Sequence, residues 1–126
     1  MFELRFDRDT RVNHIRMEGF WTPATMAAFS AALLAKNTAL HLVGNCATLV
    51  DLRQFPVQSS EVTNAIEAMM KRASAIFTAP IVAVTGSALT KFQTSRVLKA
   101  DNIRVFLDWD EANAWLDSAW PSRRAA

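Results

Sequence analysis

The chain of 126 residues is long enough for one domain with a single hydrophobic core, since a chain of this length buries roughly two thirds of its unfolded surface. Its formal net charge of +2 is too small to indicate a nucleic-acid partner, and its one cysteine, Cys46, excludes an internal disulfide bond. No apolar run approaches the ~20 residues of an integral membrane segment. We therefore expect one domain over residues 1–126 in the reducing cytoplasm, with a flexible tail at residues 119–126.

The amino-terminal residues alternate between apolar and polar side chains, as strands with one buried face do. The alternation covers residues 2–6 and, after a polar stretch at residues 7–11, resumes at Ile15 and Met17. This pattern predicts an antiparallel hairpin over residues 2–20 with one face in water. It also differs from the continuous apolar run of a signal peptide, which agrees with a cytoplasmic location.

Helical and strand patterns then alternate along the chain. The first helix is predicted over about residues 23–36, with Thr22 as its N-cap and Pro23 at its first position. Short apolar runs, typical of buried parallel strands, are at residues 47–52, 80–85 and 103–107. Between and after these strands, helical spacing predicts three more helices, over about residues 60–76, 89–97 and 108–116.

The element order is thus β-β-α-β-α-β-α-β-α, which predicts an α/β domain with a mixed sheet. In the last helix, Asp108 and Glu111 have the spacing of a capping box, and Trp115 shares its inner face with Ala112 and Leu116. We therefore expect Trp115 in the core. Residues 37–45 are too apolar for an ordinary connection, and they either extend the first helix or form an apolar surface flap.

Neither histidine is placed for catalysis or metal binding. His14 lies on the predicted wet face of a strand and His41 in the apolar connection, and neither has a second ligand at metal spacing or a nucleophile beside it. We therefore expect no metal, no cofactor and no enzymatic activity.

Two polar groups follow predicted parallel strands, where open α/β sheets bind ligands. Asp51 and Arg53 end one strand. Gly86 and Ser87 follow the next, where free backbone N–H groups could receive an anion, with Arg96 on the succeeding helix adding positive charge. An N-cap role explains Ser87 equally well without a ligand. We name all five as candidate ligand-facing residues.

The stretch VQSSEV, residues 57–62, places Ser59 and Ser60 at the start of the second helix. Either hydroxyl can accept a hydrogen bond from a free helical N–H group, which is worth about 1 kcal/mol and needs no ligand. We expect a cap first, a ligand-facing cap second and a phosphoacceptor third.

The whole pattern resembles the SpoIIAA-like group of the STAS superfamily, also described as STAS/SEC14-like domains. The resemblance covers about residues 2–118 and is carried by the stretches GFWTPATMAAF, LVDLRQF, PIVAVT and RVFLDWDEANAWL. It implies a STAS-type sheet with a cluster of helices in a bacterial cytoplasmic protein. Anti-anti-sigma members carry a phosphorylated serine in an Asp-Ser-Ser/Thr-Gly sequence, but here Gln58 and Glu61 stand where that acid and that glycine would be.

These observations favour a non-enzymatic STAS-like module that binds a small ligand or a protein, including a second copy of itself as a homodimer. The ligand would be a small anion or a lipid. The alternative is a SEC14-like lipid or peripheral membrane binder, and the third candidate is a phosphorylation-switched regulator of the anti-anti-sigma kind.

Overall fold

A five-stranded sheet forms the centre of the fold, with its strands in the order of the sequence. The computed structural model describes residues 1–40, 46–76, 78–87 and 102–120. The strands are β1 (Phe2–Asp7), β2 (Val12–Glu18), β3 (Ala47–Gln54), β4 (Ile81–Thr85) and β5 (Ile103–Phe106). β1 and β2 pair antiparallel, and each later strand runs parallel to the one before it. The predicted mixed sheet is therefore confirmed, whereas the helix predicted over residues 89–97 lies outside the described residues.

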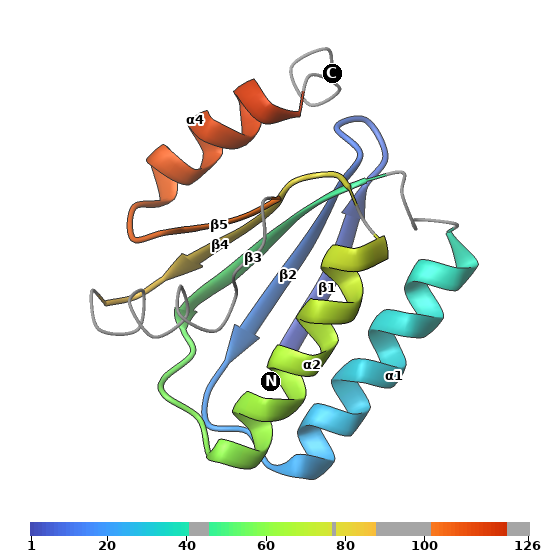
Figure 1. Ribbon diagram of the computed structural model, residues 1–126, viewed down its shortest axis with the longest axis vertical. Helices are drawn as coiled ribbons and strands as arrows, with labels where there is room; N and C mark the ends of the chain where they lie inside the picture. The colour runs from blue at the N-terminus through green and yellow to red at the C-terminus, as the bar shows by residue number, and fades with distance from the viewer. Residues whose placement is uncertain (41–45, 77, 88–101, 121–126) are drawn as a thin grey trace.

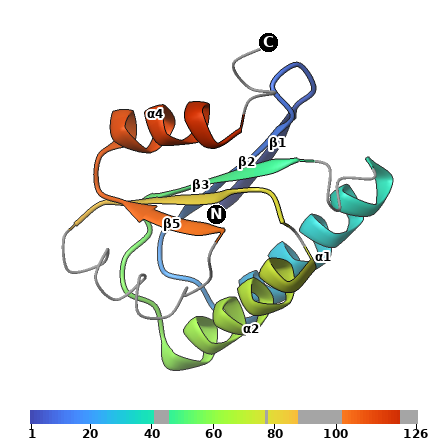
Figure 2. The same cartoon turned by 45° about the horizontal axis from the view of Figure 1, so that its top comes forward.

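Helices cover both faces of this sheet (Figures 1 and 2). α1 (Pro23–Ala39) and α2 (Ser60–Ile76) lie on one face, and α4 (Trp109–Ala119) lies on the other. Because side chains alternate along a strand, β3 contributes to both layers. Val50 and Leu52 pack toward α1 and α2, whereas Leu49 packs toward α4.

Aromatic rings form the core beneath α1 and α2. The ring of Trp21 lies with its centroid 5.1 Å from that of Phe29 and 5.2 Å from that of Phe55. Phe2 packs edge-on against both Trp21 and Phe29, a geometry that aromatic pairs favour. These contacts tie the start of α1 and the segment after β3 to the edge of the sheet.

The core beneath α4 contains the fully buried Ala112 and Leu116. Trp115 packs against this core from its border, with its ring 6.1 Å from that of Phe106, and remains half-buried. Trp115 thus contacts the core as expected, but it is not fully buried, so the expectation of a core residue is wrong in that respect. Trp115 packs beside Phe106 of β5, the strand at the edge of the sheet, and part of its ring stays accessible to solvent.

The amino-terminal hairpin has the predicted pairing, with Phe2 opposite Met17. The predicted solvent-facing side of the hairpin is confirmed at Glu3, Arg16 and Glu18. The Arg16 guanidinium pairs with the carboxylates of Glu3 and Glu18, at N–O distances of 2.7 and 2.8 Å. The same face is not wet throughout, because Val12 is fully buried in the core beneath α4. At its first residue, the side of β2 that was expected to face solvent is therefore buried.

Helix α1 begins as predicted and ends later. The hydroxyl of Thr22 accepts a hydrogen bond of 3.2 Å from the N–H of Thr25, and Pro23 occupies the first turn. The helix continues to Ala39, so the first residues of the 37–45 stretch extend it. Residues 41–45, where an apolar flap was the other expectation, lie outside the described residues.

Helix α4 also begins at its predicted cap. The carboxylate of Asp108 accepts a hydrogen bond of 2.8 Å from the N–H of Glu111. At its other end the N–H of Trp120 donates to the carbonyl oxygen of Leu116, and the indole N–H donates to that of Thr10. Ala119 and Trp120 thus belong to the helix and its C-cap, and residues 121–126 of the expected tail lie outside the described residues.

Candidate functional site

Asp51 and Arg53 form an ion pair at the carboxyl end of β3, on the face of the sheet that α4 covers. The guanidinium donates to both carboxylate oxygens, at 3.0 and 2.9 Å, and the backbone N–H of Arg53 donates to the same carboxylate at 3.1 Å. The guanidinium carbon also lies 4.2 Å from the ring centroid of Trp109, a cation–π contact. Both candidate residues are therefore engaged by groups of the chain itself.

The titration of this pair follows from its geometry. Burial alone would raise the pKa of the Asp51 carboxyl, but the hydrogen bonds from the side chain and backbone of Arg53 outweigh it and hold that pKa below its usual value. The carboxylate in turn raises the pKa of Arg53. Asp51 is consequently ionised at neutral pH, and its lowered pKa makes it a weaker base than one tuned to that pH.

Gly86 lies against Arg53 at the end of the neighbouring strand. A Cβ atom on Gly86 would collide with the carbonyl oxygen of Arg53, so packing of the two strand ends requires glycine here. The carbonyl oxygen of Ser87 accepts a 3.4 Å hydrogen bond from the Thr85 hydroxyl. The helix that Ser87 was expected to cap and Arg96 both lie outside the described residues, so an anion site at this turn stays a prediction.

Ser59, and not Ser60, caps helix α2. The Ser59 hydroxyl accepts a hydrogen bond of 3.3 Å from the N–H of Val62, and its carbonyl oxygen accepts one of 2.9 Å from Thr63. Ser60 is the first residue of the helix and is exposed. Both serines belong to the layer opposite the Asp51–Arg53 pair, so the structure brings Asp51, Arg53 and Gly86 together and leaves the serines apart from them.

Gln58 connects the loop between β2 and α1 to the loop between β3 and α2. Its Oε1 atom accepts a hydrogen bond of 2.7 Å from the N–H of Trp21, and its Nε2 atom donates to the carbonyl oxygens of Gly19 and Pro56 at 3.0 and 2.7 Å. The chain turns at Gly19 with a φ of +79°, a left-handed conformation that favours glycine. Gln58 therefore holds the segment that precedes α1 next to the segment that precedes α2.

The histidines do not form a metal site among the described residues. His14 is half-buried on β2, and His41 lies outside the described part of the chain. Within that part, no group of three or more His, Cys, Asp or Glu side chains is arranged to hold a metal ion.

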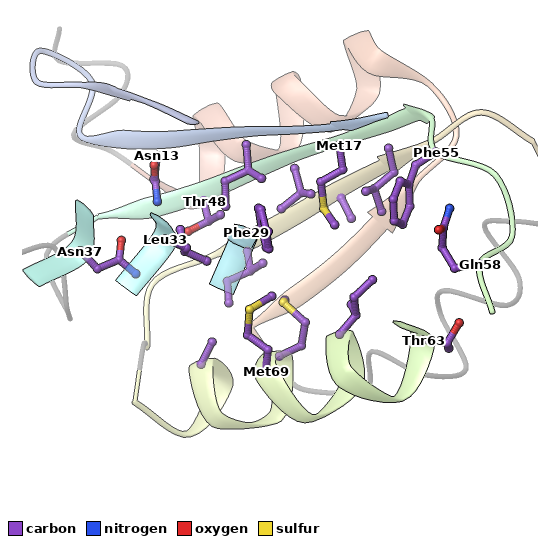
Figure 3. A pocket seen from close by; sticks show the side chains of 18 of the residues that line it. Asn13, Met17, Phe29, Leu33, Asn37, Thr48, Phe55, Gln58, Thr63 and Met69 are labelled. Carbon is purple, nitrogen blue, oxygen red and sulfur yellow. The ribbon is translucent and has the colours of Figure 1, made fainter. Parts of the chain in front are cut away.

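A cavity of about 180 Å³ lies between the sheet and helices α1 and α2. Figure 3 shows the side chains of Met17, Phe29 and Met69 converging on it from β2, α1 and α2. The apolar side chains in the middle of α2, including Ile66 and Met69, are only half-buried, which indicates that the helix does not pack tightly onto the sheet here. The cavity is therefore the space between an apolar helix face and the sheet. The described residues that line it are Asn13, Ile15, Met17, Phe29, Leu33, Asn37, Cys46, Thr48, Val50, Leu52, Phe55, Pro56, Val57, Gln58, Thr63, Ile66, Met69, Met70, Ala73, Ile81 and Ala83.

Polar side chains gather at one end of this cavity. Asn13 and Thr48 are register partners on adjacent strands, and Asn37 approaches from α1, at the end opposite Gln58 and Thr63 (Figure 3). Asn13 is 3% exposed, and its Oδ1 atom is buried without a hydrogen-bond partner among the described residues. The Oδ1 atom of Asn37 is also buried without a hydrogen-bond partner among the described residues. The cavity thus has an apolar body and an end with two unsatisfied amide oxygens.

The sequence contained a signal for this site that the motif-based predictions did not use. Asn13 has the same strand phase as Ile15 and Met17, and Asn37 follows Phe29 and Leu33 at intervals of four on α1. Residues at these intervals share a face, so a polar residue among apolar ones marks an inward-pointing amide. The predicted candidates Asp51, Arg53, Ser59, Ser60, Gly86 and Ser87 are absent from the described cavity lining.

Comparison with solved structures identifies the fold. RsbS from Moorella thermoacetica, in a form with a serine-to-glutamate substitution, superposes with a TM-score of 0.65 over 92% of this chain and 94% of that chain. The chain has the SpoIIAA-like STAS fold. The sequence identity is 15%, and a likeness at this level concerns the fold. No protein-family model and no curated relative matches the sequence.

The STAS fold here has no bilayer-spanning helix within the described residues. None of the helices in residues 1–40, 46–76, 78–87 and 102–120 combines the length and the apolar character that crossing a membrane requires.

Proposed function

We propose that this chain is a non-enzymatic STAS-fold binding module that holds a small, largely apolar molecule between its sheet and helices α1 and α2. The observation that carries this proposal is the cavity of about 180 Å³ with its apolar lining. Small-molecule sites in proteins are typically concave and apolar, with a few polar groups that fix orientation. This cavity has that composition.

The size of the cavity limits the ligand. An apolar protein cavity of about 150 Å³ holds benzene, so a cavity of about 180 Å³ suits a molecule of about eight non-hydrogen atoms. Drug-sized ligands occupy about 300 to 1,000 Å³, and a diacyl lipid is larger again. The volume therefore favours a small single-chain or single-ring compound over the SEC14-like lipid that was the alternative.

The lining also supports binding without turnover. It contains no histidine, carboxylate, lysine or arginine among the described residues. Its one thiol, Cys46, is buried, and burial raises the pKa of that thiol, which keeps it in the weakly nucleophilic neutral form. A general base and an activated nucleophile are thus both missing from the described lining, and we assign the chain a binding role.

Ethylbenzene is a suitable probe for this proposal, because it is uncharged and has about the size that the cavity suits. We expect a dissociation constant of about 0.1 to 1 mM by isothermal titration or ligand-observed NMR. Ala73→Leu adds bulk to the cavity wall on α2 and should weaken binding at least about tenfold. Ala68→Leu makes the same change on the exposed face of the same helix and should leave binding unchanged. Absence of binding to the unmodified chain, or equal binding to Ala73→Leu, would contradict the proposal.

A second candidate function is protein binding at the end of the molecule where Gln58 joins two loops. Phe20 and Val57 lie on these loops and are 67% and 56% exposed. Exposed apolar side chains on neighbouring loops favour an interaction with another protein or with a second copy of the chain. This patch supports the homodimer expected from the sequence. Phe20 is absent from the described cavity lining, whereas Val57 is part of it.

Sedimentation at several concentrations tests the second candidate. If the patch mediates self-association, the double variant Phe20→Ser, Val57→Ser should dissociate at concentrations where the unmodified chain is dimeric. Leu34→Ser is the matched control, since Leu34 is 68% exposed but lies in the middle of α1. A chain that is monomeric at all concentrations would exclude the homodimer and leave only a different protein as the partner.

A further inference from the structure

The polar end of the cavity indicates what kind of ligand it accepts. Asn13 and Thr48 lie side by side on β2 and β3, and Asn37 faces them from α1 (Figure 3). The Oδ1 atoms of both asparagines are buried without a hydrogen-bond partner among the described residues. Buried polar atoms in folded proteins nearly always have such a partner. A bound molecule with its own hydrogen-bonding group at this end would supply one.

The charge of the lining restricts that group further. No lining residue of the described chain is Asp, Glu, Lys, Arg or His. An ionised head group placed here would lose its hydration and gain no opposite charge, which is strongly unfavourable. An uncharged head group loses much less, because an asparagine amide offers both a donor and an acceptor. The anionic ligand expected from the sequence therefore does not fit this cavity.

We propose that the cavity selects an uncharged amphiphile, with an alcohol or amide head at the Asn13, Asn37 and Thr48 end and an apolar body against Phe29 and Met69. This inference rests on the proposed function, because it concerns the ligand of the same cavity. It assigns the amides of Asn13 and Asn37 a role in recognition of the ligand.

Head-group preference is measured with the unmodified chain and four probes of matched size: 1-heptanol, hexanamide, hexanoate and heptylammonium. Titration at pH 7 keeps the last two charged. We expect 1-heptanol and hexanamide to bind at least about tenfold more tightly than either ion. Because this comparison uses one protein, it does not depend on whether a variant folds.

Substitution of the amides tests their assignment. Asn13→Leu retains the approximate size of the side chain and removes its polar atoms. We expect it to weaken 1-heptanol binding about tenfold, to leave ethylbenzene binding within about twofold, and to leave the melting temperature unchanged or higher. Asn37→Leu should behave in the same direction. Asn64→Leu, on the exposed face of α2, is the matched control and should change neither affinity.

The outcomes separate the two proposals. If neither ethylbenzene nor any alkyl probe binds, the proposed function fails and this inference fails with it. If ethylbenzene binds but the four head groups bind equally well, or an ion binds best, only the inference of an uncharged amphiphile is overturned. If Asn13→Leu loses ethylbenzene and 1-heptanol alike and melts earlier, Asn13 is a structural residue and its recognition role is rejected.

Discussion

The side-chain oxygen of Gln58 accepts a hydrogen bond from the backbone N–H of Trp21, which lies 37 positions earlier in the sequence. The side-chain nitrogen of Gln58 donates to the carbonyl oxygens of Gly19 and Pro56. A carboxylate could accept from Trp21 but could not donate to either carbonyl oxygen. A glutamine at this position, where anti-anti-sigma proteins carry an acid, therefore has a structural explanation.

Gln58→Glu tests this explanation. The change preserves side-chain size but replaces two hydrogen-bond donors with an oxygen that repels the carbonyl groups. We expect the free energy of unfolding in urea to fall by about 1 to 2 kcal/mol. Gln54→Glu makes the same chemical change at an exposed side chain and should stay within about 0.5 kcal/mol of the unmodified chain. Equal effects of the two substitutions would show that Gln58 does not hold the loops together.

The serine pair at the start of α2 gives an asymmetric prediction. Ser59→Ala removes the hydroxyl that accepts from the N–H of Val62 and should cost about 1 kcal/mol in urea denaturation. Ser60→Ala should change stability by less than about 0.5 kcal/mol, because Ser60 is exposed and is not the cap. The reverse order of the two costs would make Ser60, and not Ser59, the cap of α2.

The same serines allow a direct test of the phosphorylation switch. Phosphate on Ser59 would compete with the cap, whereas Ser60 is exposed and free of that constraint. Our ranking of cap above switch predicts that intact-mass analysis of protein from its native cells shows no phosphate. A phosphorylated Ser60, combined with partner binding that Ser60→Asp abolishes or creates, would reverse this ranking.

Trp115 and Leu116 are neighbours on α4 with different depths. Leu116 is fully buried, so Leu116→Ala should cost about 3 to 4 kcal/mol. Trp115 is half-buried against Phe106, and Trp115→Ala should cost less, about 1 to 2 kcal/mol, because part of its ring is already in water. Denaturant titration of both variants decides the order. A larger loss for Trp115→Ala would mean that it is the core residue the sequence predicted.

The Asp51–Arg53 pair predicts a pH dependence. The pKa of Asp51 is held below its ordinary value of 3.8 in the folded chain. Its ionised form therefore stabilises the fold fully above the unfolded pKa, and this stabilisation is lost as the pH falls through the lower folded pKa. Asp51→Asn should lower the free energy of unfolding at pH 7 by about 1 kcal/mol.

The difference between Asp51→Asn and the unmodified chain should shrink as the pH is lowered from 5 toward 2, because both then carry an uncharged side chain. Asp9→Asn, at an exposed turn position, is the control and should show little difference at either pH. A difference for Asp51→Asn that is constant with pH would mean that shape, and not charge, accounts for its cost.

Much of the fold could be predicted from local patterns. Alternation with period two located β1 and β2, and caps at Thr22 and Asp108 located the starts of α1 and α4, because these signals act within a few residues. Helix ends were less certain, since α1 continues past its predicted end to Ala39 with no proline or glycine to stop it. The half-burial of Trp115 depends on its position beside β5 at the edge of the sheet. No local sequence pattern indicates that position.

The candidate site could be predicted only in part. Asp51 and Arg53 were expected to face a ligand because strand ends often do. The structure shows them paired with each other, with Arg53 also over the Trp109 ring, and their contact with a ligand stays a prediction. The cavity arises from the distance between α2 and the sheet, which depends on the sum of many side-chain sizes. The inward phase of Asn13 and Asn37 was visible in the sequence, but only the structure shows that their amides meet at one end of the same space.

The stand-off of α2 from the sheet also has a mechanical consequence. Unfolding under hydrostatic pressure is favoured by the internal void volume that unfolding eliminates, and the part of the space beneath α2 that its apolar lining keeps free of water contributes to that volume. The ligand-free chain should therefore unfold at lower pressure than its Ala73→Leu variant, whose cavity is partly filled. A bound amphiphile would make the fold less compressible, so that high-pressure fluorescence or NMR would register occupancy of the cavity without any label on the ligand.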